Sequence, residues 1–279
     1  MKDQKVWLVT GASKGLGLAL VKQLLNNGHK VAATSRTIAG LEKAVDFSSG
    51  SFFPLATDLA SESSVAEAIE KTINAFGKID VVVNNAGYGL FGALEELTDS
   101  EARENFNINV FGSLNIIRAV LPQLRLQGSG HIINIASIGG FTGMFPGFGI
   151  YCATKFAVHG FTEALAAEVK PFGINATVVS PGYFRTSFLT SDSFVIPEKQ
   201  VPAYQSVREM QATHQDNING NQPGDPEKGA AAIITLTEQS NPPLHLFLGQ
   251  DAYDMAYVKM ESVKNDLETW KTLSTSTAY

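Results

Sequence analysis

A tyrosine and a lysine stand four residues apart in the stretch YCATK, residues 151–155. On a helix, positions i and i+4 share one face, so the lysine ammonium would lie near the phenol. This pair has two interpretations: an ordinary solvated helix face, or a site where Lys155 eases loss of the phenolic proton of Tyr151. A free tyrosine has a pKa of about 10, so proton exchange near neutral pH needs positive charge close to the phenol.

Three glycines form a second candidate site. Gly11, Gly15 and Gly17 lie directly between the β-rich run VWLVT (6–10) and a run with helical spacing at 18–27. Glycine accepts positive φ angles and lets the backbone approach a ligand closely. The start of a helix adds free N–H groups and the positive end of the helix dipole. The turn therefore fits a pyrophosphate, although a tight turn without a ligand carries the same glycines.

Strands and helices alternate around these residues. Strands are expected at 6–10, 30–35, 51–58, 79–87, 130–137, 174–182 and 244–248, and helices at 18–27, 38–46, 61–76, 99–126 (broken near Pro122) and 150–170. Strands that are apolar on both faces and joined by helices predict a parallel sheet with helices on each side. We therefore expect an α/β fold with one doubly wound, Rossmann-type, parallel seven-stranded sheet in a single domain over residues 1–279.

Two segments depart from this alternation. Residues 183–226 are long and mixed in character, and they follow the carboxyl end of a strand, where such sheets bind ligands. Long insertions in compact domains are usually functional or mobile, so we expect a substrate lid, with a passive surface excursion as the alternative. A C-terminal helical tail is expected at about 250–273, with Trp270 as an anchor on its own domain or on a neighbouring subunit.

Composition excludes several classes of protein. Of 279 residues, 44% are hydrophobic and 17% charged, which supplies a large core and argues against disorder. The net charge of −6 and the lack of a basic stripe argue against a nucleic-acid partner. The single cysteine, Cys152, allows no internal disulfide. With no signal peptide and no membrane span in view, we expect a cytoplasmic protein.

The motifs in combination resemble the short-chain dehydrogenase/reductase family. They are the G-x-x-x-G-x-G turn, NNAG (84–87), Ser137, YCATK and PG (181–182), and the resemblance runs from about residue 5 to 186. It implies that Tyr151 exchanges a proton with a carbonyl oxygen as hydride reaches the carbon, while Lys155 holds the nicotinamide ribose. It also implies that Ser137 binds the substrate oxygen and that Asn109 positions a water beside the lysine. With these motifs present, Tyr151 and Lys155 are interpreted as a catalytic pair.

The end of the second strand indicates which nicotinamide cofactor is bound. An NAD site places Asp or Glu there, whereas this chain has Ser35 followed by Arg36. Lys14 adds a second positive charge from the glycine turn. Two cations without a carboxylate fit a 2′-phosphate, so we expect NADP.

Family resemblance extends the cofactor site. It implies that Asp58 receives the adenine amino group, that Asn84 and Ala86 pass beside the adenosine ribose, and that Thr186 binds the carboxamide. The full expected cofactor set is Gly11, Ser13, Lys14, Gly15, Leu16, Gly17, Ser35, Arg36, Asp58, Leu59, Asn84, Ala86, Gly87, Tyr151, Lys155, Pro181, Gly182 and Thr186.

Phenylalanines gather between Ser137 and Tyr151 and again in the expected lid. We expect an apolar pocket for a ketone or secondary alcohol of moderate or large size, with core packing as the alternative for each side chain. The expected pocket residues are Phe141, Met144, Phe145, Phe148, Phe184 and Phe188, and Phe194 is a further lid candidate. Cys152 is expected to be a small filler. The five histidines lack ligand-like spacing, so no catalytic metal is predicted.

These expectations lead to three functional hypotheses. The first is an NADPH-dependent carbonyl reductase resembling bacterial ketoreductases and 17β-hydroxysteroid and retinol dehydrogenases. The second is the same site run as an alcohol dehydrogenase on a steroid-like or retinoid-like substrate. The third is a non-catalytic NADP-sensing protein, a class that typically loses the tyrosine or lysine that this chain keeps. The resemblance also implies a homodimer or homotetramer built on the helices around 99–126 and 150–170.

Overall fold

A sheet of seven parallel strands forms the centre of the molecule. The computed structural model describes residues 4–47, 49–190 and 193–279. The strand order is β3-β2-β1-β4-β6-β7-β9, so the chain winds outward in one direction from β1 and then in the other from β4. The strands are β1 (Val6–Val9), β2 (Lys30–Ser35), β3 (Phe52–Ala56), β4 (Val81–Asn84), β6 (Gly130–Ile135), β7 (Ile174–Pro181) and β9 (His245–Leu248). This confirms the expected doubly wound α/β fold, whose ligand crevice lies where the order reverses.

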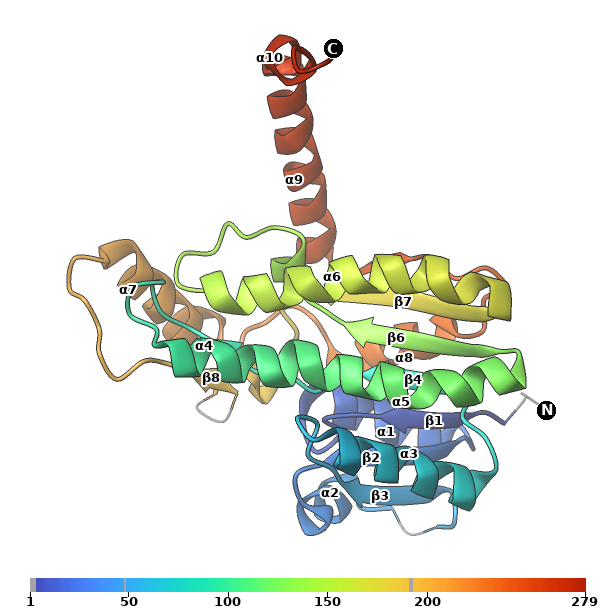
Figure 1. Cartoon of the computed structure of the whole chain (residues 1–279). Coiled ribbons are helices and arrows are strands. Elements are labelled where there is room, and N and C mark those ends of the chain that lie inside the picture. The colour runs from blue at the N-terminus through green and yellow to red at the C-terminus, as the bar shows by residue number, and fades with distance from the viewer. Residues whose placement is uncertain (1–3, 48, 191–192) are drawn as a thin grey trace.

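Helices cover both faces of this sheet (Figure 1). On one face, α1 (Gly15–Asn26), α2 (Ile38–Val45) and α8 (Pro226–Leu236) pack on Trp7 and Val9. On the other, α3 (Glu62–Phe76), α5 (Gly112–Gln127) and α6 (Gly149–Val169) pack on Leu8. Successive strand residues point to opposite faces, so strands buried on both sides carry unbroken apolar runs.

The predicted break near Pro122 is wrong. Helix α5 continues through Pro122, because a proline removes only one helical hydrogen bond and buried neighbours such as Val120 and Leu124 hold the helix in place. The irregularity lies earlier, where a π-helical turn (Asn107–Phe111) joins α4 (Asp99–Phe106) to α5. This wide turn buries Asn109, which is 1% exposed.

Residues 183–226, the lid segment, fold over the carboxyl ends of the strands. Residues 191–192 lie outside the described part of this segment. The rest contains a 3₁₀ turn (Ser187–Leu189), β8 (Phe194–Val195), α7 (Gln205–Ala212) and a π-helical turn (Thr213–Ile218). Strand β8 pairs in parallel with β5 (Gly89–Leu90), a two-stranded sheet that the sequence did not predict. An apolar cluster that includes Phe91, Phe148 and Phe194 fills the space beneath the lid segment.

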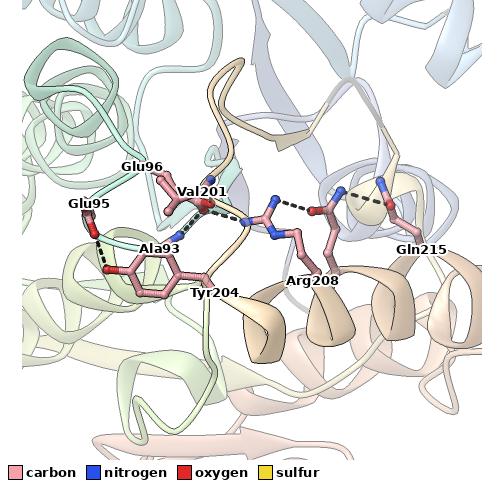
Figure 2. Close-up of polar contacts among 8 residues, drawn as sticks. Ala93, Glu95, Glu96, Val201, Tyr204, Arg208 and Gln215 are labelled. Carbon is pink, nitrogen blue, oxygen red and sulfur yellow. Dashed lines mark hydrogen bonds and ion pairs between the residues drawn. The ribbon is translucent and has the colours of Figure 1, made fainter.

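A buried carboxylate ties the lid segment to the body (Figure 2). Glu96 accepts hydrogen bonds from the Ala93 N–H at 2.7 Å, the Val201 N–H at 2.8 Å and Arg208 Nη2 at 2.6 Å. Its side chain is fully buried, whereas the neighbouring Glu95 is exposed and accepts a hydrogen bond from the Tyr204 hydroxyl. Glu96 is therefore a polar anchor for residues 201–208.

The C-terminal tail is helical, as expected. Helix α9 (Gln250–Thr269) and the short α10 (Lys271–Thr275) project away from the body (Figure 1). Only Ala252 and Ala256 of α9 are buried, and Trp270 is 59% exposed, so Trp270 is not an anchor on its own domain. Among the described residues, no helix combines the length and the apolarity needed to cross a membrane.

Candidate active site

The glycine turn lies at the end of β1 and opens helix α1. Gly11 and Gly15 adopt φ angles of +64° and +58°, a region that other residues rarely occupy. A Cβ on Gly11 would stand 2.7 Å from the Ala86 Cα, so the turn also needs the small residue for its close approach to the chain beyond β4. Helix α1 then presents its first N–H groups at this turn.

Hydrogen bonds fix the turn against the end of β4. Thr10 Oγ1 accepts from the Asn85 N–H at 3.0 Å and from the Ala86 N–H at 3.1 Å. The Asn85 side chain donates to the carbonyls of Thr10 and Gly11 at 2.9 and 3.0 Å. The two strand ends on either side of the sheet's switch point are thereby held as one rigid edge.

A cavity of about 880 Å³ opens at this edge. Its walls come from the ends of β1, β2, β4, β6 and β7, from α6 and from the lid segment. Most of the expected cofactor residues line it: Gly11, Ser13, Lys14, Gly15, Leu16, Ser35, Arg36, Asp58, Leu59, Ala86, Gly87, Tyr151, Lys155, Pro181, Gly182 and Thr186.

Two expected cofactor residues do not line the cavity. Asn84 still belongs to β4 and points into the sheet, where its side chain donates to Asn134 Oδ1 at 2.8 Å. Gly17 is buried inside α1 against the Asn85 side chain. Asn85, which is not among the expected cofactor residues, lines the cavity instead. Successive side chains of a strand face opposite ways, so following this alternation to the end of the strand before NNAG could have identified Asn85.

Ser137, Tyr151 and Lys155 meet on one wall of the cavity. Ser137 follows β6, and its hydroxyl acts on the Tyr151 phenol, whose pKa it lowers. On α6, Lys155 lies one turn after Tyr151, with its Nζ 5.9 Å from the centre of the phenol ring. Lys155 Nζ also donates to the Ile135 carbonyl at 2.9 Å. The i,i+4 pair expected from YCATK therefore shares a face, and that face is buried.

Burial sets the protonation of this group. It raises the pKa of Tyr151 above its ordinary value, and the Ser137 hydroxyl offsets only part of that rise. It lowers the pKa of Lys155 to about 8, because a desolvated ammonium is disfavoured. Tyr151 therefore holds its proton at neutral pH, the state that a proton donor needs.

Asn109 supports this wall from behind and does not line the cavity. Its side chain accepts from the Tyr88 N–H and donates to the Tyr88 carbonyl, both at 3.0 Å, and it also donates to Thr154 Oγ1 at 3.1 Å. Thr154 lies on α6 between Tyr151 and Lys155. The π-helical turn thus ties the chain beyond β4 to the helix that carries the tyrosine and lysine.

Aromatic side chains line the other half of the cavity. Phe145, Phe148 and Phe188 lie there, as expected, whereas Phe184 lines the cavity but packs against the cluster that α1 and α8 form. Phe148 and Phe188 have ring centres 6.0 and 5.9 Å from that of Tyr151. This half of the cavity is therefore apolar beside the phenol.

Three other expected apolar residues lie elsewhere. Phe141 closes a 3₁₀ turn and points toward β9, where its ring lies 5.1 Å from that of Phe247. Met144 is 72% exposed on the outer side of the loop. Phe194 is buried against Phe91 beneath the lid segment, with ring centres 5.3 Å apart. The expectation that Phe141 and Met144 line the pocket is wrong, because a run of apolar residues in a loop does not reveal which way each points.

The structure adds polar groups that no motif indicated. The Tyr183 hydroxyl and His214 Nε2 lie 2.9 Å apart in the cavity wall, and His214 Nδ1 lies 2.8 Å from the Met210 carbonyl. Gln222 is 2% exposed and lines the cavity, and its side-chain amide has no hydrogen-bond partner among the described residues. Cys152 also lines the cavity, and burial raises the pKa of its thiol to about 11.

One group of potential metal ligands lies among the described residues, away from the cavity lining. His159, Glu163 and His245 bring one ligand atom each to within 4.8 Å of the others. The two imidazoles stack with ring centres 5.7 Å apart, and His159 Nε2 lies 2.8 Å from Ser180 Oγ. Spacing along the sequence could not show this cluster, because β9 brings His245 beside α6 only in the folded chain.

A parallel sheet with a glycine turn at its switch point and a cavity across it defines a dinucleotide-binding α/β protein. Residues 5–193 match the family model described as short chain dehydrogenase. The chain belongs to this family of oxidoreductases. Solved structures of this fold hold NAD in some cases and NADP in others.

Similar proteins cover nearly the whole chain. Oxidoreductase BOA17 of Botryotinia fuckeliana is 38% identical over 98% of this chain and 99% of its own length. The 3-ketodihydrosphingosine reductase of Bacteroides thetaiotaomicron is 38% identical over 88% of each protein. A short-chain dehydrogenase of Streptomyces avermitilis superposes with a TM-score of 0.91 at 37% identity, covering 99% of this chain and all of that one.

Proposed function

We propose that the protein is an NADPH-dependent carbonyl reductase that converts a ketone to a secondary alcohol. The observation that carries this proposal is the group of Ser137 with the buried Tyr151 and Lys155, which faces both the glycine turn and the aromatic half of one cavity. A protonated phenol beside an apolar wall is suited to give a proton to a carbonyl oxygen. When bound, the cofactor supplies the hydride.

Each residue of the group has a distinct part in this proposal. Tyr151 hydrogen-bonds the substrate carbonyl oxygen and passes its proton to it. Ser137, which lines the same cavity as the phenol, holds the same oxygen in place. Lys155 binds the nicotinamide ribose and keeps positive charge near the phenolate that remains. Asn109 is a positioning residue, because it acts through Thr154 and Tyr88 and does not reach the cavity.

The end of β2 supports NADPH over NADH. Ser35 donates a hydrogen bond to the Thr37 carbonyl at 2.7 Å, and the exposed Arg36 follows it in the cavity wall. Lys14 lines the same end of the cavity. An arginine fork suits a 2′-phosphate, and no carboxylate stands at the end of β2 to repel it.

The shape of the remaining space supports an apolar ketone. Phe145, Phe148 and Phe188 would surround the part of the substrate beyond the carbonyl. One relative at 38% identity is named as a reductase of a 3-keto compound, which is consistent with this substrate class. Gln222 adds one amide that would hydrogen-bond a polar substituent of the substrate.

Oxidation of NADPH and NADH should be measured against aliphatic, aryl and bulky ketones. The Tyr151→Phe variant should lose turnover and keep its affinity for NADPH, because the ring stays and only the proton donor goes. Turnover that survives this change would contradict the proposed chemistry.

Specificity for the phosphate has its own test. The Arg36→Leu variant should raise the Michaelis constant for NADPH far more than that for NADH, because only NADPH carries the 2′-phosphate. An equal effect on both would contradict the assignment of Arg36.

A further inference from the structure

Helix α9 carries an apolar stripe that none of the residues described by the structure covers. Beyond the first turns of α9, every residue from 260 to 279 is exposed, in the rest of α9, in α10 and after it. Even so, the large apolar side chains follow one another at spacings of three and four residues, the pattern of a helix–helix seam. The stripe consists of Tyr253, Tyr257, Met260, Val263, Leu267 and Trp270, each between 42% and 62% exposed.

A helix with this stripe gains most from a partner helix. Twenty residues extend about 30 Å, and a lone helix of this length is only marginally stable in water without packing. The first turns are held to the body by Ala252 and Ala256, which pack near Ile138 and Phe247. The rest of α9 projects away from the body (Figure 1), and the side chains of the stripe are exposed, so the body fixes the direction of the helix and leaves the stripe accessible.

The charges beside the stripe point to a second copy of this chain. In a two-fold antiparallel pair, a residue that meets another is met by it in return. If Met260 of one helix faces Val263 of the other, Tyr253 faces Trp270, and Lys259 lies beside Asp266 on the same edge. The pairing places this attractive contact twice, once on each side of the axis.

Other arrangements of the same two helices are disfavoured by charge. Sliding the antiparallel pair by one heptad would bring Lys259 against Lys259 or Asp266 against Asp266. A parallel pair would bring Lys259 against Lys264. We therefore propose that α9 forms an antiparallel two-helix contact with α9 of a second copy, in the register that joins Lys259 to Asp266.

The experiment measures the mass of the full-length protein in low salt by light scattering and sedimentation velocity. Leu267→Glu should halve the mass of the assembly, because it buries a charge in the seam. Lys259→Asp and Asp266→Lys should each weaken association about tenfold or more, since each turns two attractive contacts into repulsive ones. The double exchange, with both substitutions in one chain, should restore the assembly.

Glu268→Lys is the matched control, because it changes charge on the same helix but off the seam. It should leave the mass unchanged, and all variants should keep wild-type turnover. The proposal is overturned if the wild-type protein is monomeric, if Leu267→Glu keeps the mass, or if the double exchange behaves like the single variants. It is also overturned if the monomer binds vesicles of phosphatidylcholine and phosphatidylglycerol through Leu267, since the stripe would then be a membrane contact.

Discussion

Replacing Glu96 with glutamine should release the lid segment. Burial alone would raise the pKa of Glu96, but hydrogen bonds from the Val201 and Ala93 N–H groups and the charge of Arg208 outweigh it and lower that pKa. The side chain is therefore a carboxylate at neutral pH that accepts three hydrogen bonds through two oxygens (Figure 2). Glutamine keeps the shape and turns one of those acceptors into a donor.

The cost follows from which oxygen is lost. If Oε1 becomes the amide nitrogen, the Val201 N–H loses its acceptor, and if Oε2 does, Ala93 and Arg208 lose theirs. Leaving one such donor unsatisfied costs about 1–3 kcal/mol. Giving up the contact to Val201 is the smaller loss, so the lid segment opens in preference to the loop around Ala93. The equilibrium between closed and open lid should shift by about 5–150-fold.

Hydrogen exchange measures this shift directly, because amides in 194–212 exchange through local opening. Their exchange should accelerate in the Glu96→Gln variant by the factor above, with exchange in β1 and β4 unchanged. Glu95→Gln is the control: the same substitution one residue earlier, at an exposed side chain whose hydrogen bond from Tyr204 glutamine can still accept. Equal exchange in the two variants would refute the anchoring role of Glu96.

Two further predictions concern the cavity wall and the glycine turn. The pKa of Lys155 is about 8 in the folded chain and near 10.5 in the unfolded chain, so between pH 8 and 9 the unfolded state binds more protons and Lys155 makes the free energy of unfolding rise with pH. Denaturant titrations at several pH values should therefore give a steeper rise of the unfolding free energy with pH for the wild type than for Lys155→Met. Parallel curves for the two proteins would contradict this prediction. Gly11→Ala should lower the free energy of unfolding by about 1–2 kcal/mol, because φ is positive and Ala86 blocks the new Cβ. Gly160→Ala, in an open position on α6, should not destabilise, and equal melting temperatures for the two alanine variants would argue against strain at Gly11.

The parts of the site that could be predicted are those fixed by local geometry. A glycine turn between a strand and a helix, and a Tyr–Lys pair at i,i+4, have one arrangement wherever the flanking elements form. Gly11, Tyr151 and Lys155 therefore line the cavity, as expected from the sequence. The alternation of apolar strands and helices fixed the sheet for the same reason, since a strand apolar on both faces needs helices on both sides.

The parts that escaped prediction depend on contacts between distant segments. His214 and Gln222 reach the cavity only because the lid segment folds back over it, and no local pattern distinguishes them from surface residues. Phe141 is an apolar loop residue like its neighbours, but its side chain packs in the cluster beside β9 and not in the cavity. The π-helical turn around Asn109 follows from side-chain hydrogen bonds to Tyr88, which propensity does not encode.

The lid segment packs against the Tyr151 phenol. Phe188 belongs to the lid segment and lies beside the Tyr151 ring, and His214 packs on Phe148 at 4.9 Å between ring centres. These contacts exclude water from the phenol, and that burial is the main cause of its raised pKa. Opening the lid segment would hydrate the phenol and bring its pKa back toward its ordinary value. A closed lid segment therefore keeps the Tyr151 phenol protonated, and Glu96, far along the chain from Tyr151, helps to hold the lid segment closed.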